Sequence, residues 1–401
     1  MNLKDSLRAE LDALLSEDPA AARQREAGRF DTLAAPHADT LVLFGAGNLG
    51  RRTLAGLRKL GVEPVAFSDN NAAAWGKEVE GVPVYSPAEA AERFGQSAAF
   101  VVTIWGGRGT ERMSARCAQL ASLGVARVVP FAFLYWKHPD VFLPHYALDS
   151  AHKVLAAAEQ VRAAFEIFDD EASLREYVGQ IRWRLQLDFD ALPLPVAHDI
   201  YFPDDLTRVG EQEVFVDCGA FDGDTVKSFV ERHGERFGKF LAFEPDPANF
   251  EKLQAYVDTL PAPVCDKITA YPYATGTQEG VVRFDATGTA AAKVGTGTLE
   301  VRCVRLDDFL ADAGMTWLKM DIEGAEIDTL LGAAGLIARG NPVLAVCVYH
   351  LQDHVWTLPL LMRRLSPDSQ LFLRPHVLES WDLLCYAVPT ERLAASGNLN
   401  R

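Results

Sequence analysis

The segment VFVDCGAFDGDTVKSF, residues 214–229, decides the fold of the C-terminal half of this chain. Its apolar start predicts a buried strand, its glycines predict a tight loop, and its end predicts a helix. Loops of this kind usually offer backbone N–H groups and a helix N-terminus to an anion. This loop contains Asp217, Asp222 and Asp224, whose charges would repel a pyrophosphate. The segment therefore predicts a nucleotide-type loop whose ligand carries cationic groups.

The residues after this loop continue the alternation of strands and helices. Strand-to-helix segments run through residues 239–256, 267–276, 316–333 and 342–350. Such alternation predicts βαβ units and a mostly parallel, doubly wound sheet, with ligands at the carboxyl ends of its strands. The last two apolar runs, QLFLRPHV at 370–377 and WDLLCYAVP at 381–389, predict a C-terminal antiparallel hairpin.

A second glycine loop lies in the N-terminal half. Gly45, Gly47 and Gly50 form GxGxxG between a predicted strand and a predicted helix, and Asp69 ends the next strand. This is the context of a dinucleotide fingerprint, so these residues and Asn48 are candidate contacts to a nucleotide, NAD or a nucleotide sugar. The alternative is a Rossmann-like domain that kept the fold and lost or changed the ligand. Both interpretations stay open.

The chain divides into four segments. Residues 1–35 predict an alanine-rich helical segment that packs on the first domain, and residues 36–145 predict a Rossmann-like nucleotide-binding domain, where residues 105–108 could close over a ligand. Residues 146–210 have helical spacing and predict a connector, and residues 211–401 form the second sheet domain. The predicted fold class is therefore α/β, with two Rossmann-like doubly wound domains joined by a helical connector.

Composition excludes several classes of protein. The formal charge of −16 over 401 residues argues against a nucleic-acid partner, because such binding needs concentrated Lys and Arg. No apolar run approaches the roughly 20 residues that span a bilayer, so no membrane partner is expected. The charged N-terminus lacks the apolar core of a signal peptide, which predicts a cytoplasmic protein. The six cysteines are scattered without a CxxC pair. A homo-oligomer is left open.

S-adenosylmethionine is the cofactor that suits an acidic glycine loop, because it presents an ammonium, a sulfonium and a ribose diol. Gly219 would give the tight turn, Asp217 would face the ammonium, and Asp224 with Thr225 would open the helix beside it. Glu244, at the end of the next strand, would accept both ribose hydroxyls. Helix capping is the alternative role for Asp222 and Asp224. The predicted cofactor-binding set is Asp217, Gly219, Ala220, Gly223, Asp224, Thr225, Glu244 and Asp246.

Methyl transfer to a hydroxyl also needs alignment and a base. Asp321 and His350 end two successive strands, so we expect them to share the pocket rim and to remove the proton from the acceptor. Asp321, Glu323 and His350 could alternatively hold a divalent metal, Mg²⁺ or Mn²⁺, that acidifies the hydroxyl. Glu326 is expected to stabilise a helix N-terminus. His376 on the hairpin is the second candidate base.

Residues 214 to the C-terminus resemble the FkbM family of S-adenosylmethionine-dependent methyltransferases. The resemblance lies in FVDCGAFDGDT, FEPDPANFEKL, VRLDDFL and above all LKMDIEGAEIDTLLGA at 318–333. It implies a class I methyltransferase sheet, a small-molecule acceptor such as a sugar or natural product, Asp217, Gly219, Gly223 and Glu244 as cofactor contacts, and Asp321 and Glu323 as motif residues. Many methyltransferases place an acid or amide against adenine after the third strand, where this chain has YPYATG. The adenine contact is therefore left unassigned.

Four functions remain under comparison. The leading one is a small-molecule O-methyltransferase. An amine or nucleic-acid methyltransferase typically carries an NPPY or DPPY turn after the fourth strand, where this chain has MDIEGAE. The domain of the first glycine loop resembles units attached to some sugar-modifying enzymes. An NAD-dependent sugar-modifying oxidoreductase or epimerase is therefore a further alternative. The last alternative is a non-catalytic nucleotide-binding module.

Overall fold

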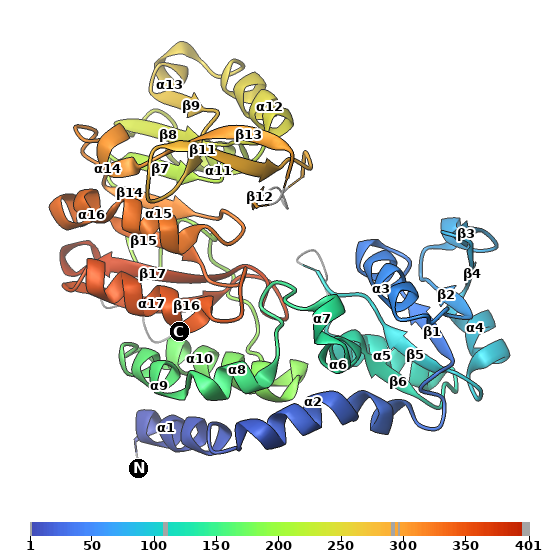
Figure 1. Cartoon of the computed structure of the whole chain (residues 1–401). Coiled ribbons are helices and arrows are strands. Elements are labelled where there is room, and N and C mark those ends of the chain that lie inside the picture. The colour runs from blue at the N-terminus through green and yellow to red at the C-terminus, as the bar shows by residue number, and fades with distance from the viewer. Residues whose placement is uncertain (1, 107–110, 290–292, 296, 395–401) are drawn as a thin grey trace.

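The computed structural model describes residues 2–106, 111–289, 293–295 and 297–394. The sheets of the two halves lie on opposite sides of the molecule, and the N-terminal helices run along its base from one side to the other (Figure 1). Within the described ranges, no helix is both long and apolar enough to cross a membrane.

The N-terminal half consists of two helices and the first sheet. The leading helices are α1 (Leu3–Leu14) and α2 (Pro19–Ala34). The strands are β1 (Leu41–Phe44), β2 (Ala66–Ser68), β3 (Glu78–Val79), β4 (Val82–Tyr85), β5 (Ala99–Val102) and β6 (Val128–Pro130). The helices around them are α3 (Asn48–Lys59), the 3-10 turn η1 (Ala72–Ala74), α4 (Pro87–Phe94) and α5 (Met113–Ser122).

The first sheet has the order β3-β4-β2-β1-β5-β6. All its neighbouring strands are parallel except β3 and β4. β1 and β5 are apolar and buried along their whole length, as expected for strands covered by helices on both faces. This half therefore has the mostly parallel α/β sheet that the sequence predicts.

The first domain ends with the helices α6 (Phe131–Lys137) and α7 (Pro139–Phe142). The connector that follows is helical, with α8 (Ala151–Ala156), α9 (Ala158–Glu166), α10 (Glu171–Gln186) and η2 (Phe189–Ala191). α10 packs on the edge of the second sheet, and α9 packs on the last long helix of that domain. Between η2 and the second sheet the chain has no helix or strand, and this stretch carries Tyr201 to the candidate site.

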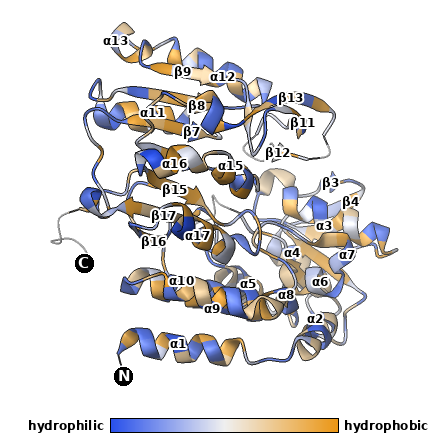
Figure 2. Ribbon diagram, turned by 60° about the vertical axis from the view of Figure 1, so that its left-hand side comes forward, coloured by the Kyte–Doolittle hydropathy of each residue, from blue (hydrophilic) through white to orange (hydrophobic). Residues whose placement is uncertain are grey.

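The N-terminal helices pack only in part as the sequence predicts. α2 packs on the first domain, against β6 and the helix at Phe131–Lys137, as expected. α1 instead packs on α10, where Arg182 donates to Glu10 over 2.7 Å. Leu7 and Leu11 of α1 are buried, and hydrophobic and hydrophilic residues alternate along this helix (Figure 2). An amphipathic pattern shows that a helix has a buried face but not which surface covers it.

The second domain is built around a seven-stranded sheet with the order β16-β17-β15-β14-β7-β8-β9. Its strands are β7 (Val214–Cys218), β8 (Lys239–Phe243), β9 (Ile268–Tyr271), β14 (Trp317–Met320), β15 (Val343–Cys347), β16 (Ser369–Pro375) and β17 (Leu383–Pro389). β16 and β17 form the predicted antiparallel hairpin, and β17 is inserted beside β15. The helices are α11 (Asp224–His233), α12 (Pro247–Val257), α13 (Ala262–Cys265), α14 (Leu306–Phe309), α15 (Glu326–Gly332), α16 (Ala334–Gly340), α17 (His354–Leu365) and η3 (Thr390–Arg392).

A small third sheet was not anticipated from the sequence. Its strands are β10 (Ala274–Thr275), β11 (Gly280–Asp285), β12 (Lys293–Val294) and β13 (Leu299–Val304), in the order β10-β13-β11-β12. It is an insertion between β9 and β14 and lies at the carboxyl side of the main sheet (Figure 1). Most of β11 is exposed, so the sequence there has no continuous apolar run that would identify a core strand.

Close backbone packing at the first glycine loop yields a test of this fold. A Cβ atom at Gly50 would lie 1.9 Å from the carbonyl oxygen of Gly45, whereas a Cβ atom at Gly47 would meet nothing within 4 Å. We expect Gly50→Ala to force α3 away from the loop and to lower the free energy of unfolding by about 1–3 kcal/mol or more. Gly47→Ala is the matched control and should be nearly neutral in urea unfolding. Equal stability of the two variants would contradict this packing.

Candidate active site

A pocket opens at the carboxyl ends of β7, β8 and β14, where a doubly wound sheet binds its ligands. The third sheet covers one side of it through Phe284 and Val294, and the connector contributes Tyr201. Of the predicted cofactor residues, three line the pocket: Gly219, Asp224 and Glu244. The other five predicted cofactor residues do not line the pocket and instead lie next to residues that do. They are Asp217, Ala220, Gly223, Thr225 and Asp246. Both Asp321 and Glu323 line the pocket.

Gly219 allows the loop after β7 to touch the end of β14. It has a φ of +85°, and a Cβ atom there would lie 1.9 Å from the carbonyl oxygen of Asp321. Only glycine satisfies both conditions without strain. The amides of Gly219 and Ala220 both donate to the carbonyl of Phe243 at the end of β8. This single turn therefore joins the ends of three strands, and Gly223, with a φ of +91°, closes it by donating to Ala220.

Glu244 is held as a hydrogen-bond acceptor facing the pocket. One carboxylate oxygen accepts from the amide of Phe221 and the other from the amide of Asp246, both at 2.8 Å. Burial raises the pKa of Glu244 to about 7, and these backbone donors oppose the rise. The two amides orient the carboxylate and leave its remaining lone pairs for a ligand.

Asp246 and Asp224 serve local structure as well. Asp246 caps α12 by accepting from the amides of Ala248 and Asn249, and its other oxygen accepts from Gly288 at 2.9 Å. It therefore fixes the loop of the third sheet to the main domain. Asp224 is the first residue of α11, and its carboxylate accepts a hydrogen bond from the amide of its neighbour Thr225. Asp224 can therefore stabilise the start of the helix and also line the pocket.

Asp217 forms a buried ion pair beneath the pocket. Its side chain is 0% exposed, that of Lys319 is 2% exposed, and their charged atoms lie 2.9 Å apart. Burial opposes the charge on Lys319, but Asp217 and Asp321 hold its pKa above the ordinary value. The ammonium also donates to the carbonyl of Gly219 at 2.6 Å and lies 4.9 Å from the ring of Tyr201. We expected Asp217 to face a ligand ammonium, but its partner in this structure is Lys319.

Asp321 lies at the centre of a set of donors. One oxygen accepts from the hydroxyl of Tyr201 at 2.8 Å, and the other lies 3.4 Å from the hydroxyl of Tyr349 and 3.1 Å from Nε2 of His350. Burial opposes its charge, but His350 and Lys319 hold the pKa of Asp321 well below its usual range. Asp321 is therefore a permanent carboxylate, oriented in the pocket and weakly basic.

His350 lies next to Asp321 and Glu323, as the sequence predicts, and is enclosed by carboxylates. Its side chain is 1% exposed, Nδ1 lies 2.7 Å from Glu326, and Nε2 lies between Asp321 and Glu323. Burial opposes the charged ring, but Glu326 and Asp321 hold the pKa of His350 well above its ordinary value. The surrounding carboxylates thus favour the charged ring, which is a weaker base than a neutral one. The base pair of His350 with Asp321 and the metal set with Glu323 stay predictions.

The loop after β14 places two further acids. Glu323 has a φ of +54°, a left-handed conformation that costs free energy in a residue with a Cβ atom and that is concentrated at functional sites. Its side chain lines the pocket. Glu326 starts α15 as predicted, is fully buried, and accepts from the amide of Ile322 as well as from His350. The loop after β14 therefore places Glu323 in the pocket wall and Glu326 beneath the pocket, in contact with His350.

Several lining residues were missed by sequence reasoning. Strand alternation already places Lys319 on the same side as Asp321, two residues later, but it gave Lys319 no role in the site. Tyr349 precedes His350 and so belongs to the opposite strand face, and Tyr201 lies in a proline-rich stretch without a motif. His376, the second candidate base, is bonded to Tyr386 at 2.7 Å, and burial lowers its pKa to about 4. It is not part of the pocket lining.

The first glycine loop has the backbone of a nucleotide site. Gly45 has a φ of +115°, and α3 begins at Gly47 without a side-chain cap. The carboxylate of Asp69 accepts from the amides of Ala46 and Asn71, both at 2.7 Å. A nucleotide at this loop, with Asn48 and Gly50 as further contacts, stays a prediction. Trp105 does not close over the loop, because it is buried against the second domain, and Gly107 and Arg108 lie outside the described residues.

The charged state of His350 can be tested by pH. Folding raises the pKa of His350, so its charged interaction with Glu326 stabilises the folded protein fully at a pH below the unfolded pKa of about 6.5. This stabilisation is lost as pH rises through the pKa of the folded state. His350→Gln leaves Glu326 without its partner, which should lower the free energy of unfolding by about 3–5 kcal/mol at pH 6. The deficit should shrink as pH rises past the folded pKa.

The matched control is His198→Gln. This histidine also lies near two carboxylates, but its side chain is 43% exposed, and exposed pairs contribute little. Denaturant unfolding of both variants from pH 5 to 10 provides the measurement. A deficit for His350→Gln that grows with pH would contradict the assignment of a charged ring.

Comparisons with known proteins agree with this geometry. The sequence profile of the Methyltransferase FkbM domain matches residues 217–371. A crystal structure of a methyltransferase FkbM from Methylobacillus flagellatus KT has a similar fold, with a TM-score of 0.75 and 22% identity, covering 96% of this chain and 98% of that one. No curated protein matches the sequence. The matched residues contain the glycine loop, Glu244, Asp321 and His350. Residues 217–371 of this chain therefore form an FkbM-type methyltransferase domain.

Proposed function

We propose that this protein is an S-adenosylmethionine-dependent O-methyltransferase that acts on a hydroxyl of a small molecule such as a sugar, a nucleotide sugar or another natural product. The observation that carries the proposal is one pocket with two carboxylates held for different tasks. Glu244 is oriented by two backbone amides, and Asp321 is oriented by Tyr201 and His350. Both line the same pocket.

The residues present fit the cofactor. Glu244 offers two oriented oxygens, which suit the neighbouring hydroxyls of a ribose. Phe243, Tyr273 and Phe284 line the pocket with aromatic rings, which suit an adenine. Asp224 places a negative charge at the same wall. When bound, S-adenosylmethionine supplies a methyl group on positively charged sulfur, which is complementary to these acids.

The acceptor side of the pocket favours a hydroxyl compound. Asp321 is a fixed acceptor that can receive a hydrogen bond from an acceptor hydroxyl and align its oxygen. Tyr201 and Tyr349 provide hydroxyl groups beside it. Because the third sheet and the connector both contribute to the pocket wall, and because the chain carries a formal charge of −16, a small molecule fits better than a polyanion.

Replacement of Glu244 tests the cofactor assignment. Glu244→Ala removes two charged hydrogen bonds to the cofactor, each worth about 1.5–3 kcal/mol, so the affinity for S-adenosylhomocysteine should fall by roughly 100-fold or more. Isothermal calorimetry on the full chain provides the measurement.

Glu251→Ala on the exposed face of α12 is the control and should bind as the unmodified protein does. If Glu244→Ala binds S-adenosylhomocysteine with wild-type affinity, Glu244 is not a cofactor contact. Binding of NAD without binding of S-adenosylhomocysteine would instead favour an oxidoreductase that uses the first glycine loop.

A further inference from the structure

Tyr201 enters the pocket from outside the residues that the FkbM profile matches. The profile covers residues 217–371, whereas Tyr201 lies in the irregular stretch between η2 and β7. Tyr201 is 9% exposed, and its ring lies 4.9 Å from Nζ of Lys319. Both Tyr201 and Asp321 line the pocket. The connector therefore contributes a polar side chain to the acceptor side of the pocket.

The backbone around Tyr201 is fixed by contacts that do not involve the hydroxyl of this residue. One carboxylate oxygen of Asp199 accepts from the amides of Tyr201 and Phe202, at 3.1 and 3.2 Å. The other oxygen accepts from Ser228 at 3.1 Å and from Arg232 at 3.2 Å, and both of these residues lie on α11. Tyr201 is thus held in place by its neighbours, so its hydroxyl has no anchoring task.

The hydroxyl of Tyr201 can only accept a hydrogen bond from a ligand. It donates its one proton to Oδ2 of Asp321 at 2.8 Å, and this is its one hydrogen bond among the described residues. An ionised carboxylate is an acceptor only, so the phenol proton stays committed to it. The phenol oxygen keeps its lone pairs for a donor, and Oδ2 of Asp321 keeps a further lone pair as well.

Two hydrogen-bond acceptors therefore lie side by side in the pocket wall, the phenol oxygen of Tyr201 and Oδ2 of Asp321. Their separation of 2.8 Å is that of two hydrogen-bonded oxygens. The oxygens of neighbouring hydroxyls on a sugar ring are spaced similarly, so each hydroxyl can donate to one of the two acceptors. The side chain of Asp321 is 26% exposed, so a ligand can reach it. A ligand with a single hydroxyl would leave one acceptor without a donor, which is costly in a desolvated site.

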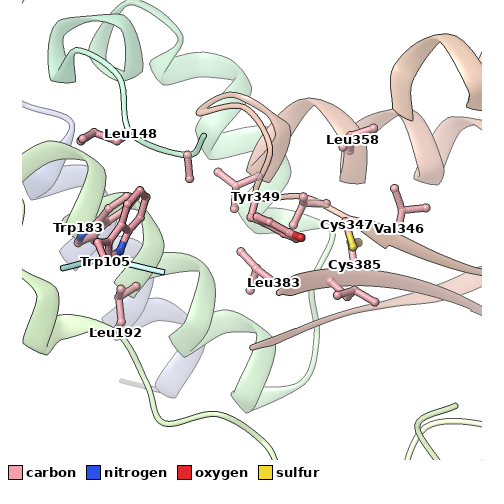
Figure 3. Packing of buried hydrophobic residues seen from close by; sticks show 14 of the residues in the cluster. Trp105, Leu148, Trp183, Leu192, Val346, Cys347, Tyr349, Leu358, Leu383 and Cys385 are labelled. Atoms are coloured by element: carbon pink, nitrogen blue, oxygen red, sulfur yellow. The ribbon is translucent and has the colours of Figure 1, made fainter. Parts of the chain in front are cut away.

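Tyr349 does not offer the same pairing. Its ring lies in the hydrophobic cluster with Leu383 (Figure 3), and its hydroxyl lies 3.4 Å from Oδ1 of Asp321. Nε2 of His350 lies 3.1 Å from the same oxygen. Oδ1 therefore lies against two groups of the protein, and Oδ2 is the oxygen that a ligand can share with Tyr201.

We propose that Tyr201 and Asp321 bind two neighbouring hydroxyls of the acceptor, so that the substrate is a vicinal diol such as a sugar ring, and that Tyr201 determines this specificity. This inference rests on the proposed function and names its substrate class more closely. Two hydrogen bonds fix the orientation of the acceptor oxygen more firmly than one does. The choice of acceptor is therefore set in part by the connector, outside the residues that the family profile matches.

The test compares acceptors that differ in one hydroxyl. Transfer of labelled methyl from S-adenosylmethionine is measured with methyl glycosides, nucleoside diphosphate sugars and catechols, and with analogues of each that lack one of two neighbouring hydroxyls. The unmodified protein should prefer the diols by roughly 10-fold or more in kcat/KM. Tyr201→Phe should lower kcat/KM for the diols by about that factor and leave the analogues nearly unchanged, so that the preference disappears. Equal use of diols and analogues by the unmodified protein, or a preference that survives Tyr201→Phe, would overturn the proposal.

Tyr177→Phe is the matched control. This phenol is fully buried outside the pocket lining and donates to the carbonyl of Val161 at 2.8 Å, so the same substitution removes a bond of the same length. It should lower the unfolding temperature of the full chain by about 2 °C or more and leave the preference for diols unchanged. Tyr201→Phe should lower the unfolding temperature by less, because water can reach Asp321 in place of the lost donor.

Two measurements on Tyr201→Phe need no acceptor. A drop in unfolding temperature as large as that of Tyr177→Phe would show that the hydroxyl of Tyr201 holds the fold, and would overturn the proposal. Calorimetry should give wild-type affinity for S-adenosylhomocysteine, and a clear loss would make Tyr201 a cofactor contact and overturn it too. Because Glu244→Ala tests cofactor binding by itself, a failure of this inference is distinguishable from a failure of the proposed function.

Discussion

The buried ion pair of Lys319 and Asp217 is the interaction on which the candidate site depends. Neither charge is stable alone at this depth, because desolvation of a lone ion costs several kcal/mol or more. Lys319 connects the pair to the loop through the carbonyl of Gly219, and its charge also favours the ionised form of Asp321. Asp321 in turn lies against His350, and His350 against Glu326. Opposite charges therefore alternate beneath the pocket, so a change to one member leaves its neighbours unpaired.

This arrangement makes the pocket acidic without making it a strong base. Each of these carboxylates has a cation beside it that orients it. His350 and Lys319 hold the pKa of Asp321 low, and His350 holds that of Glu326 low, whereas burial outweighs Lys319 and raises the pKa of Asp217. Such groups suit the recognition of a cationic ligand and the alignment of a hydroxyl, because they need little reorganisation when the ligand binds.

The two domains are in direct contact. Arg116, Met113 and Trp105 of the first sheet domain bind Glu379 in the turn between β16 and β17. The connector adds Tyr201 to the pocket and packs on the outer edge of the second sheet. The third sheet adds another wall, so the pocket is built from more than the methyltransferase-type sheet alone.

The sequence by itself determined the two doubly wound sheets, the hairpin, the position of the glycine turn at Gly219 and the placement of Glu244, Asp321 and Glu323 at the pocket. These follow from periodicity and from backbone geometry that only glycine allows, both of which are local in the chain. The sequence could not show that α1 covers the connector, that Asp217 pairs with Lys319, or that His350 is enclosed by carboxylates. Protonation depends on which charges surround a group and on how much water is removed from it, and residues distant in the sequence supply both. Only the tertiary structure therefore decided which acids line the pocket and which are paired beneath it.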